Sequence, residues 1–134
     1  MKTRSLTTGI VHSDREFGVE HGGLHKPIHT SVQFGFERTE ELIGVFQGTV
    51  KNAWNYARQG TPTSSALESL VNRMEGGRGT ICFTTGMAGI CAIFLTLLRA
   101  GDHLVCSKHV FGNTNSVLGT LEDLGIAVSK VDAT

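Results

Sequence analysis

The sequence predicts an α/β protein with a parallel sheet, and three observations support this. After residue 62 the hydrophobic residues alternate between short strand-like runs and longer stretches with helical periodicity. Glycines stand between these segments, where a chain turns. The chain has 134 residues, enough for one domain with a real core. This strand–helix–strand order indicates parallel strands joined by crossover helices.

The first 60 residues are rich in Gly, His, Thr and Ser, and their hydrophobic periodicity is weak. A short helix is expected over residues 40–48, because its apolar residues share one face and Gly48 can end it. We expect the rest of this segment to be an extended arm. Such an arm cannot bury itself, so it is expected to lie on another surface.

Residues 64–75 are expected to form a helix. Its start, SALE, fits a capping box between Ser65 and Glu68, and Gly76 can supply a left-handed exit. The run TICFTT, residues 80–85, is β-branched and aromatic and has glycines on both sides. This composition predicts a buried strand.

A helix over residues 87–99 is apolar nearly all round, so we expect it to pack on more than one side. Asn113 and Thr114 are expected to cap the second crossover helix. The remaining predicted elements are a strand at 103–107, a helix at 114–125 and a strand at 126–131. Three parallel strands leave an exposed edge, so we expect this chain to be the front part of a larger protein.

Composition argues against several classes of protein. Twelve basic and twelve acidic residues cancel, so the chain has no charge footprint for nucleic acid or an anionic membrane. The start lacks an apolar signal region, and the apolar stretch 87–98 is about half a membrane span. Cys82, Cys91 and Cys106 are odd in number and lie in apolar runs, which is typical of buried packing residues in a reducing compartment. We therefore expect a cytoplasmic protein.

Three histidines, His21, His25 and His29, are spaced four apart, as ligands on one helical face would be. The glycines between them and Pro27 argue against a helix there. We therefore expect no metal site in this segment.

The stretch FTTGMAG, residues 83–89, places polar residues where a predicted strand becomes a helix. The free amides and positive dipole end of such a helix form a potential anion site. Gly86 allows close approach to its backbone, and Thr84 and Thr85 add hydroxyl donors. The P-loop and dinucleotide-binding patterns are both absent. A plain strand-to-helix turn remains the alternative interpretation.

A second stretch, YARQGTPT, carries Tyr56 and Arg58, whose phenol and guanidinium both donate well to phosphate. In an extended chain these two side chains point the same way. An exposed loop with an incidental arginine is the alternative.

Taken in order, YARQGTPTSSALESLVNRMEGG, TTGMAGI, AGDHLV and VFGNT resemble the Cys/Met-metabolism family of pyridoxal-phosphate enzymes. The family includes cystathionine γ-synthase, cystathionine lyases, methionine γ-lyase and the O-acylhomoserine sulfhydrylases. The resemblance covers most of residues 20–134. It implies that residues 61–134 are the start of the large domain of a fold-type-I pyridoxal-phosphate transferase, with residues 1–60 as an N-terminal arm.

The resemblance also implies a set of cofactor-binding residues. The amides of Gly86 and Met87 look like the cradle of the cofactor phosphate, and Phe111 matches the aromatic that stacks on the cofactor ring. Tyr56 and Arg58 look like the pair that reaches the same phosphate from a neighbouring subunit. The arm would then hold a homodimer or homotetramer together, with each site built from two chains.

For activity, the resemblance implies γ-replacement on an amino acid, most naturally an activated homoserine. A γ- or β-lyase of the same family is the alternative. Ala57 and Thr61 replace the family's usual Ser and Asn, and Phe111 stands where many members carry Tyr. A phenylalanine keeps the stacking but lacks the acid/base hydroxyl, which resembles some sulfhydrylases more than the lyases.

The family's Schiff-base lysine and the carboxylate that faces the pyridine nitrogen lie beyond residue 134. None of the lysines here matches that position; they are Lys2, Lys26, Lys51, Lys108 and Lys130. We therefore expect no catalytic residue in this chain and no activity from it alone. The alternative from another class is a non-catalytic fragment that binds only phosphate or a partner subunit.

Overall fold

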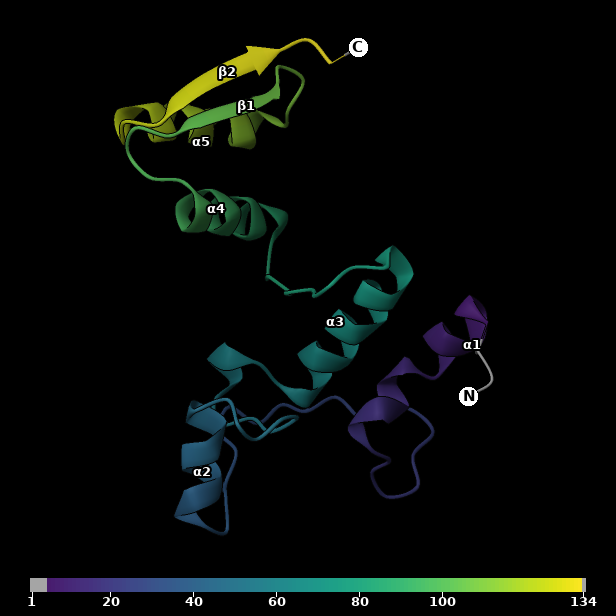
Figure 1. Ribbon diagram of the computed structural model, residues 1–134. Helices are drawn as coiled ribbons and strands as arrows, with labels where there is room; N and C mark the ends of the chain where they lie inside the picture. The colour runs from purple at the N-terminus through teal and green to yellow at the C-terminus, as the bar shows by residue number, and fades with distance from the viewer. Residues whose placement is uncertain (1–4, 134) are drawn as a thin grey trace. The chain divides into compact units, whose positions relative to one another are not determined.

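The structure is a computed structural model that describes residues 5–133. They fall into two compact units, divided between Cys82 and Phe83. The first unit is mainly helical (Figure 1). Its elements are the helices α1 (Leu6–Val11), α2 (Thr39–Phe46) and α3 (Pro62–Glu75) and the 3₁₀-helices η1 (Ser13–Phe17) and η2 (Ala57–Gln59).

Helix α3 forms close to its predicted place, but a different residue caps it. Thr61 is the N-cap: its hydroxyl accepts the Ser64 amide at 3.1 Å, and the Ser64 hydroxyl accepts the Thr61 amide at 2.9 Å. The prediction of a cap at Ser65 was wrong, because Pro62 at the first helical position already fixes φ for the helix. At the other end, Gly76 adopts the predicted left-handed conformation, with φ of 62°.

The N-terminal segment is less extended than the sequence suggested. It contains α1 and η1, both of which pack on α3. Ser5 caps α1 by accepting the Thr8 amide, while the helix itself is only six residues long. A helix this short leaves little periodicity to detect, since it depends on tertiary packing for stability.

Charged side chains anchor the loop that follows η1. Asp14 accepts the Lys26 amide at 3.1 Å and lies 3.1 Å from the His25 ring. Glu20 pairs with Lys26 and lies 2.9 Å from His29 Nε2, while Lys26 Nζ donates to the Phe17 carbonyl. Polar contacts of Asp14 and of the Phe17 carbonyl therefore tie the loop to η1, and the Glu20 pairs close the loop on itself.

Helix α2 confirms the short helix predicted over residues 40–48. Gly48 follows it with φ of 69°, a left-handed conformation that glycine adopts without strain. Two residues of its predicted apolar face, Ile43 and Phe46, are nonetheless exposed.

The second unit contains α4 (Gly86–Leu97), β1 (His103–Ser107), α5 (Gly112–Asp123) and β2 (Ala127–Val131). The strands pair in parallel, with His103 opposite Ala127 and Ser107 opposite Val131, and α5 connects them. This strand–helix–strand unit confirms the predicted parallel topology for residues 103–131. Figure 1 shows α5 lying along one face of the strand pair.

Leu118, Leu121 and Ile126 form the buried core of the second unit. The side chains packed around them come from α4, both strands and the loop before α5; they are Phe94, Leu98, Leu104, Cys106, Val110 and Val128. Cys82, Cys91 and Cys106 are free thiols, each partly rather than fully buried.

The strand predicted at residues 80–85 was wrong. Residues 80–83 have no regular structure, and Ile81 is 74% exposed. A strand needs a neighbour for its backbone hydrogen bonds, and within residues 5–133 the sheet consists of β1 and β2. The hydrophobic run alone does not supply that neighbour.

Helix α4 also differs from its prediction. It packs against α5, but none of its residues is buried, and Leu97 is 70% exposed. Within the described part of the chain, no helix is both long and apolar enough to cross a membrane.

Candidate functional site

The N-terminus of α4 has the free donors that an anion site needs. Thr85 is the N-cap in extended conformation, and its hydroxyl oxygen accepts the Ala88 amide at 3.0 Å. The amides of Gly86 and Met87 precede the first helical hydrogen bond, from Gly89 to the Thr85 carbonyl. Neither amide has an acceptor within residues 5–133. Two unpaired donors and the positive end of the dipole therefore coincide.

The space beside Gly86 is open. A Cβ placed on Gly86 would meet no atom of residues 5–133 within 4 Å, and Gly86 is exposed. Within this part of the chain, nothing fills the volume that a side chain would occupy here. Glycine thus leaves the backbone open to an incoming anion, as its absent Cβ predicts.

Phe111 lies at the start of α5, in the same unit. It is the N-cap residue, with φ of −57° and ψ of 143°, and its side chain is 69% exposed. No side chain caps this helix, so the predicted capping by Asn113 and Thr114 was wrong. Asn113 is exposed, and the Thr114 hydroxyl is used elsewhere.

Thr114 joins the first turns of α4 and α5. Its hydroxyl donates to the thioether sulfur of Met87, with 3.6 Å between oxygen and sulfur. Thr114 is 7% exposed and Met87 is half-buried. The sequence pattern gave no signal for this contact, because the two residues are 27 positions apart.

Tyr56 and Arg58 lie in the first unit and contact each other. Tyr56 forms an antiparallel bridge with Gln33, which holds its backbone extended. Arg58 lies in η2, so these two residues do not share an extended segment as predicted. The guanidinium carbon of Arg58 instead lies 4.6 Å from the centroid of the Tyr56 ring, a cation–π distance. Arg58 is exposed and Tyr56 is partly buried.

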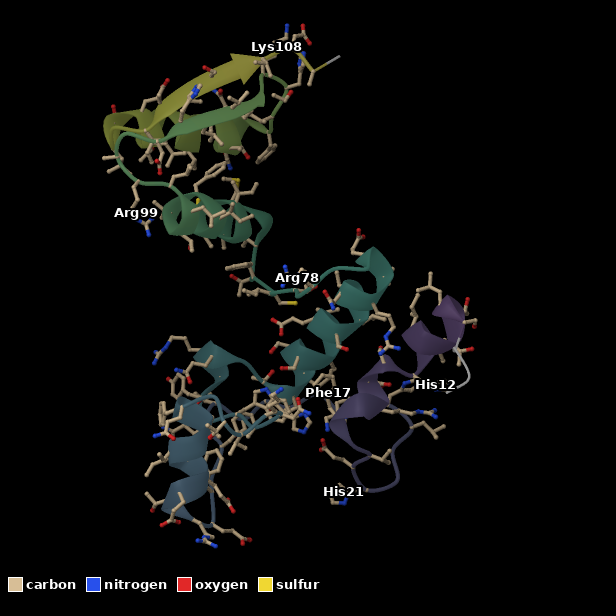
Figure 2. All side chains as sticks on the ribbon, in the orientation of Figure 1. His12, Phe17, His21, Arg78, Arg99 and Lys108 are labelled. Carbon is tan, nitrogen blue, oxygen red and sulfur yellow. The ribbon has the colours of Figure 1, made fainter. Side chains whose placement is uncertain are left out.

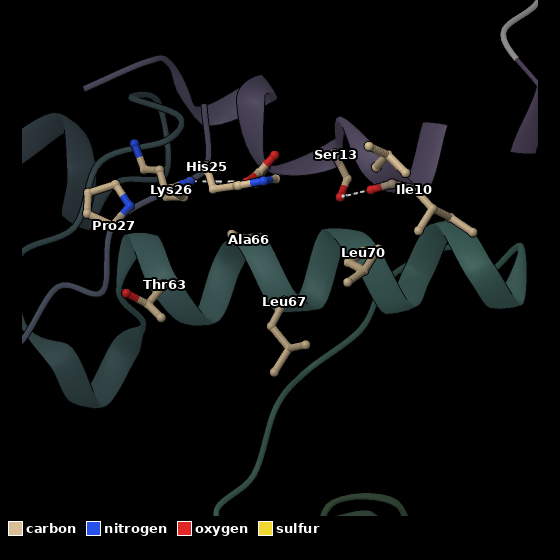
Figure 3. Close-up of a pocket in the computed structure, with 11 residues that line it drawn as sticks. Ile10, Ser13, His25, Lys26, Pro27, Thr63, Ala66, Leu67 and Leu70 are labelled. Carbon is tan, nitrogen blue, oxygen red and sulfur yellow. Dashed lines mark hydrogen bonds and ion pairs between the residues drawn. The ribbon is translucent and has the colours of Figure 1, made fainter. Parts of the chain in front are cut away.

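A cavity of about 330 Å³ lies between α3 and the α1–η1 segment, and Figure 3 shows its lining. Leu67, Leu70 and Ile10 contribute apolar surface, while Asp14 and His25 contribute polar groups. None of the predicted site residues lines it.

Two acidic groups of the first unit have lowered pKa values. Burial raises the pKa of Asp14, but hydrogen bonds from the Lys26 amide and His25 outweigh it and bring the pKa below 3.8. The hydrogen bond from Lys26 is the main cause of the lowered pKa of Glu20. Burial, followed by the charge of Glu68, raises the pKa of the Cys82 thiol, so a reactive thiolate is disfavoured there.

The histidines considered as metal ligands make separate contacts. His25 pairs with Asp14, whereas His29 pairs with Glu20. Among the described residues, no group of three or more His, Cys, Asp or Glu side chains has the arrangement of a metal site.

Three lysines are engaged by neighbouring polar groups. Lys26 pairs with Glu20, and Lys130 donates to the Asn115 side-chain oxygen at 2.6 Å. Lys108, at the end of β1, lies 2.5 Å from an Asp132 oxygen (Figure 2).

A family profile described as "Cys/Met metabolism PLP-dependent enzyme" matches residues 7–134. The chain belongs to this family. Its relatives include L-methionine gamma-lyase from Pseudomonas deceptionensis, which is 30% identical over 132 residues, covering 98% of this chain and 33% of that protein. Cystathionine beta-lyase from Bacillus subtilis is 34% identical over 97% of this chain and 31% of its own length. O-acetyl-L-homoserine sulfhydrylase from Corynebacterium glutamicum is 33% identical over 93% of this chain and 29% of its own length.

Solved structures agree with this family assignment. A putative O-acetylhomoserine (thiol)-lyase from Campylobacter jejuni aligns with a TM-score of 0.83 and 25% identity, covering 97% of this chain and 32% of that one. The metB protein of Corynebacterium glutamicum aligns with a TM-score of 0.79 and 27% identity, over the same shares. The chain therefore has the α/β fold of these structures and spans about a third of the length of the relatives it matches.

Pyridoxal phosphate, the family's cofactor, fits the residues present. Its phosphate needs donors: the Gly86 and Met87 amides have no acceptor within residues 5–133, and the space beside Gly86 is open. Its flat ring needs an exposed aromatic, and Phe111 is one.

Proposed function

We propose that the chain is part of a pyridoxal-phosphate enzyme that performs γ-replacement on an activated homoserine. The observation that carries this proposal is the pair of unpaired amides at Gly86 and Met87 in a chain of this family. In this proposal residues 61–134 begin the large domain of a fold-type-I transferase, and residues 1–60 are the arm that contacts a neighbouring subunit.

The chain's own residues bind and orient the cofactor. The Gly86 and Met87 amides donate to the phosphate, and the Phe111 ring stacks on the pyridine and shields it from water. Tyr56 and Arg58 donate to the cofactor phosphate bound by a neighbouring copy of the chain. The cation–π contact with the Tyr56 ring positions the Arg58 guanidinium for this role. When bound, pyridoxal phosphate supplies an electron sink for the carbons next to the amino group of the substrate.

Phe111 supports replacement through its resemblance to the aromatic of some sulfhydrylases. Its ring can stack, but it has no hydroxyl with which to give or take a proton at the leaving group. A γ- or β-lyase is the competing assignment within the family, because the relatives include both lyases and a sulfhydrylase.

In this proposal no residue of the 134-residue chain is covalently linked to the cofactor. Lys26, Lys108 and Lys130 are each engaged by another polar group. The chain alone therefore binds the cofactor without turnover. Self-association through the arm gives a homodimer or homotetramer in which both copies contribute to each site.

Binding and chemistry are tested separately. The chain is titrated by calorimetry with 4′-deoxypyridoxine 5′-phosphate, which lacks the aldehyde and cannot react with surface lysines. Saturable binding that inorganic phosphate displaces supports the proposal, and no binding refutes it.

The intact mass of the native protein is then measured. If it exceeds that of 134 residues, the native protein is incubated with O-acylated homoserine and a thiol. A thioether product supports γ-replacement, whereas a keto acid and ammonia indicate a lyase. If the mass matches 134 residues, a non-catalytic binding role replaces the enzyme assignment.

A further inference from the structure

The Thr114 hydroxyl has an unusual hydrogen-bond acceptor, the thioether sulfur of Met87. Thr114 is the third residue of α5, a position from which a threonine hydroxyl commonly interacts with its own helix. Here it donates to Met87 Sδ at 3.6 Å, although a thioether is a weak acceptor. The residue is buried, so this contact is made away from water.

The contact joins the two parts of the candidate site that lie in the second unit. Met87 supplies one of the free amides at the start of α4, and Phe111 lies three residues before Thr114 at the start of α5. The phosphate donors and the stacking ring therefore belong to two helices that this hydrogen bond links in their first turns. Elsewhere α4 and α5 face each other across a mainly apolar cavity, whose lining includes Phe94 of α4 and Leu121 of α5.

We propose that Thr114 is a positioning residue that sets the spacing between the phosphate-binding amides and the Phe111 ring. This inference rests on the proposed function, because it needs one ligand to bind both helices. A ligand with a phosphate and a ring needs that spacing, whereas inorganic phosphate needs only the amides of α4. Loss of the hydroxyl should therefore weaken the larger ligand selectively.

The test compares Thr114→Val, which keeps the shape but removes the hydroxyl, with Thr114→Ser, which keeps the hydroxyl. Dissociation constants are measured by calorimetry for 4′-deoxypyridoxine 5′-phosphate and for inorganic phosphate. Thr114→Val should weaken the first ligand by up to about fivefold, the upper bound set by one ordinary hydrogen bond because the thioether is a weak acceptor, and should leave inorganic phosphate unchanged. Thr114→Ser should bind both ligands like the unmodified chain.

Met87→Leu supplies the matched partner, because it removes the sulfur and keeps the backbone amide. In the Met87→Leu background, Thr114→Val should have no further effect on the larger ligand. Equal weakening of both ligands, or an undiminished effect of Thr114→Val without the sulfur, would overturn the inference. If the unmodified chain binds neither ligand, the result refutes the proposed function itself. Failure of the Thr114 inference alone is recognised because the unmodified chain then still binds both ligands.

Discussion

Removing the amide hydrogen of Gly86 tests most specifically whether the Gly86 and Met87 amides bind phosphate. Gly86 is the first residue of α4, where proline is well tolerated because its missing N–H has no helical acceptor. The preceding Thr85, with φ of −143° and ψ of 154°, is already in the region that a residue before proline prefers. Gly86→Pro therefore deletes one donor and leaves the helix in place.

The expected magnitude follows from the charge of the ligand. A hydrogen bond to a charged group contributes about 1.5–3 kcal/mol, so Gly86→Pro should weaken 4′-deoxypyridoxine 5′-phosphate binding by about tenfold to a hundredfold. Calorimetric titration measures this loss directly. Circular dichroism should show unchanged helix content.

Gly112→Pro is the matched control. Gly112 is the first residue of α5, and a Cβ there also meets nothing within 4 Å. Gly112→Pro should leave the affinity for 4′-deoxypyridoxine 5′-phosphate close to that of the unmodified chain. If Gly86→Pro binds as tightly as the unmodified chain, or if Gly112→Pro loses as much, the amide of Gly86 is not a phosphate donor.

Three further predictions concern Arg58 and a neighbouring subunit, the Phe111 ring, and Asp14 in η1. If Arg58 contacts the phosphate bound by a neighbouring chain, a refolded mixture of Arg58→Ala and Gly86→Pro chains should regain some sites that bind 4′-deoxypyridoxine 5′-phosphate tightly, because a mixed pair has one site with both native residues. No regain of tight binding would mean that both residues act in the site of a single chain. Phe111→Ala should weaken the binding of 4′-deoxypyridoxine 5′-phosphate about tenfold, since an aromatic contact adds to burial, whereas Phe111→Tyr should bind it normally. Equal affinity of the unmodified chain and both variants would refute ring stacking. Because the folded pKa of Asp14 lies below 3.8, its stabilisation is present above that pH and is lost as the pH falls through the folded pKa. Trp54 fluorescence during urea unfolding should show that loss, and Asp14→Asn should flatten it; an identical pH profile in the variant would contradict the assignment.

Hydrophobic periodicity predicted the elements of residues 103–131 well. Leu118 and Leu121 are both buried, whereas Leu124, expected on the same inward face, is 53% exposed. Both strands around α5 form where expected. This part of the fold could be predicted because each element packs on a near neighbour in the sequence. The same reasoning found α2 and α3, whose ends are marked by Gly48 and Gly76.

The failures have physical causes that sequence patterns do not contain. Residues 80–85 look like a strand, yet a strand forms only with a hydrogen-bonding partner, and no such partner is found within residues 5–133. The cap of α3 shifted to Thr61 because proline at the next position dictates the backbone.

The candidate site also has features that the sequence predicts and features that it does not. The free amides of Gly86 and Met87 follow from local geometry and were predictable. The stacking of Arg58 on Tyr56 and the Thr114–Met87 hydrogen bond depend on side-chain directions that no spacing rule supplies.

In the proposed site the first amides of α4 bind the phosphate of a pyridoxal-type ligand. The most direct measurement is a nuclear magnetic resonance titration of the ¹³C,¹⁵N-labelled chain with 4′-deoxypyridoxine 5′-phosphate. We expect the resonances of the Gly86 and Met87 amides to shift most within α4 and to saturate at the same ligand concentration as those of the Phe111 ring protons. Saturating shifts confined to other residues, with these two amides unchanged, would contradict it.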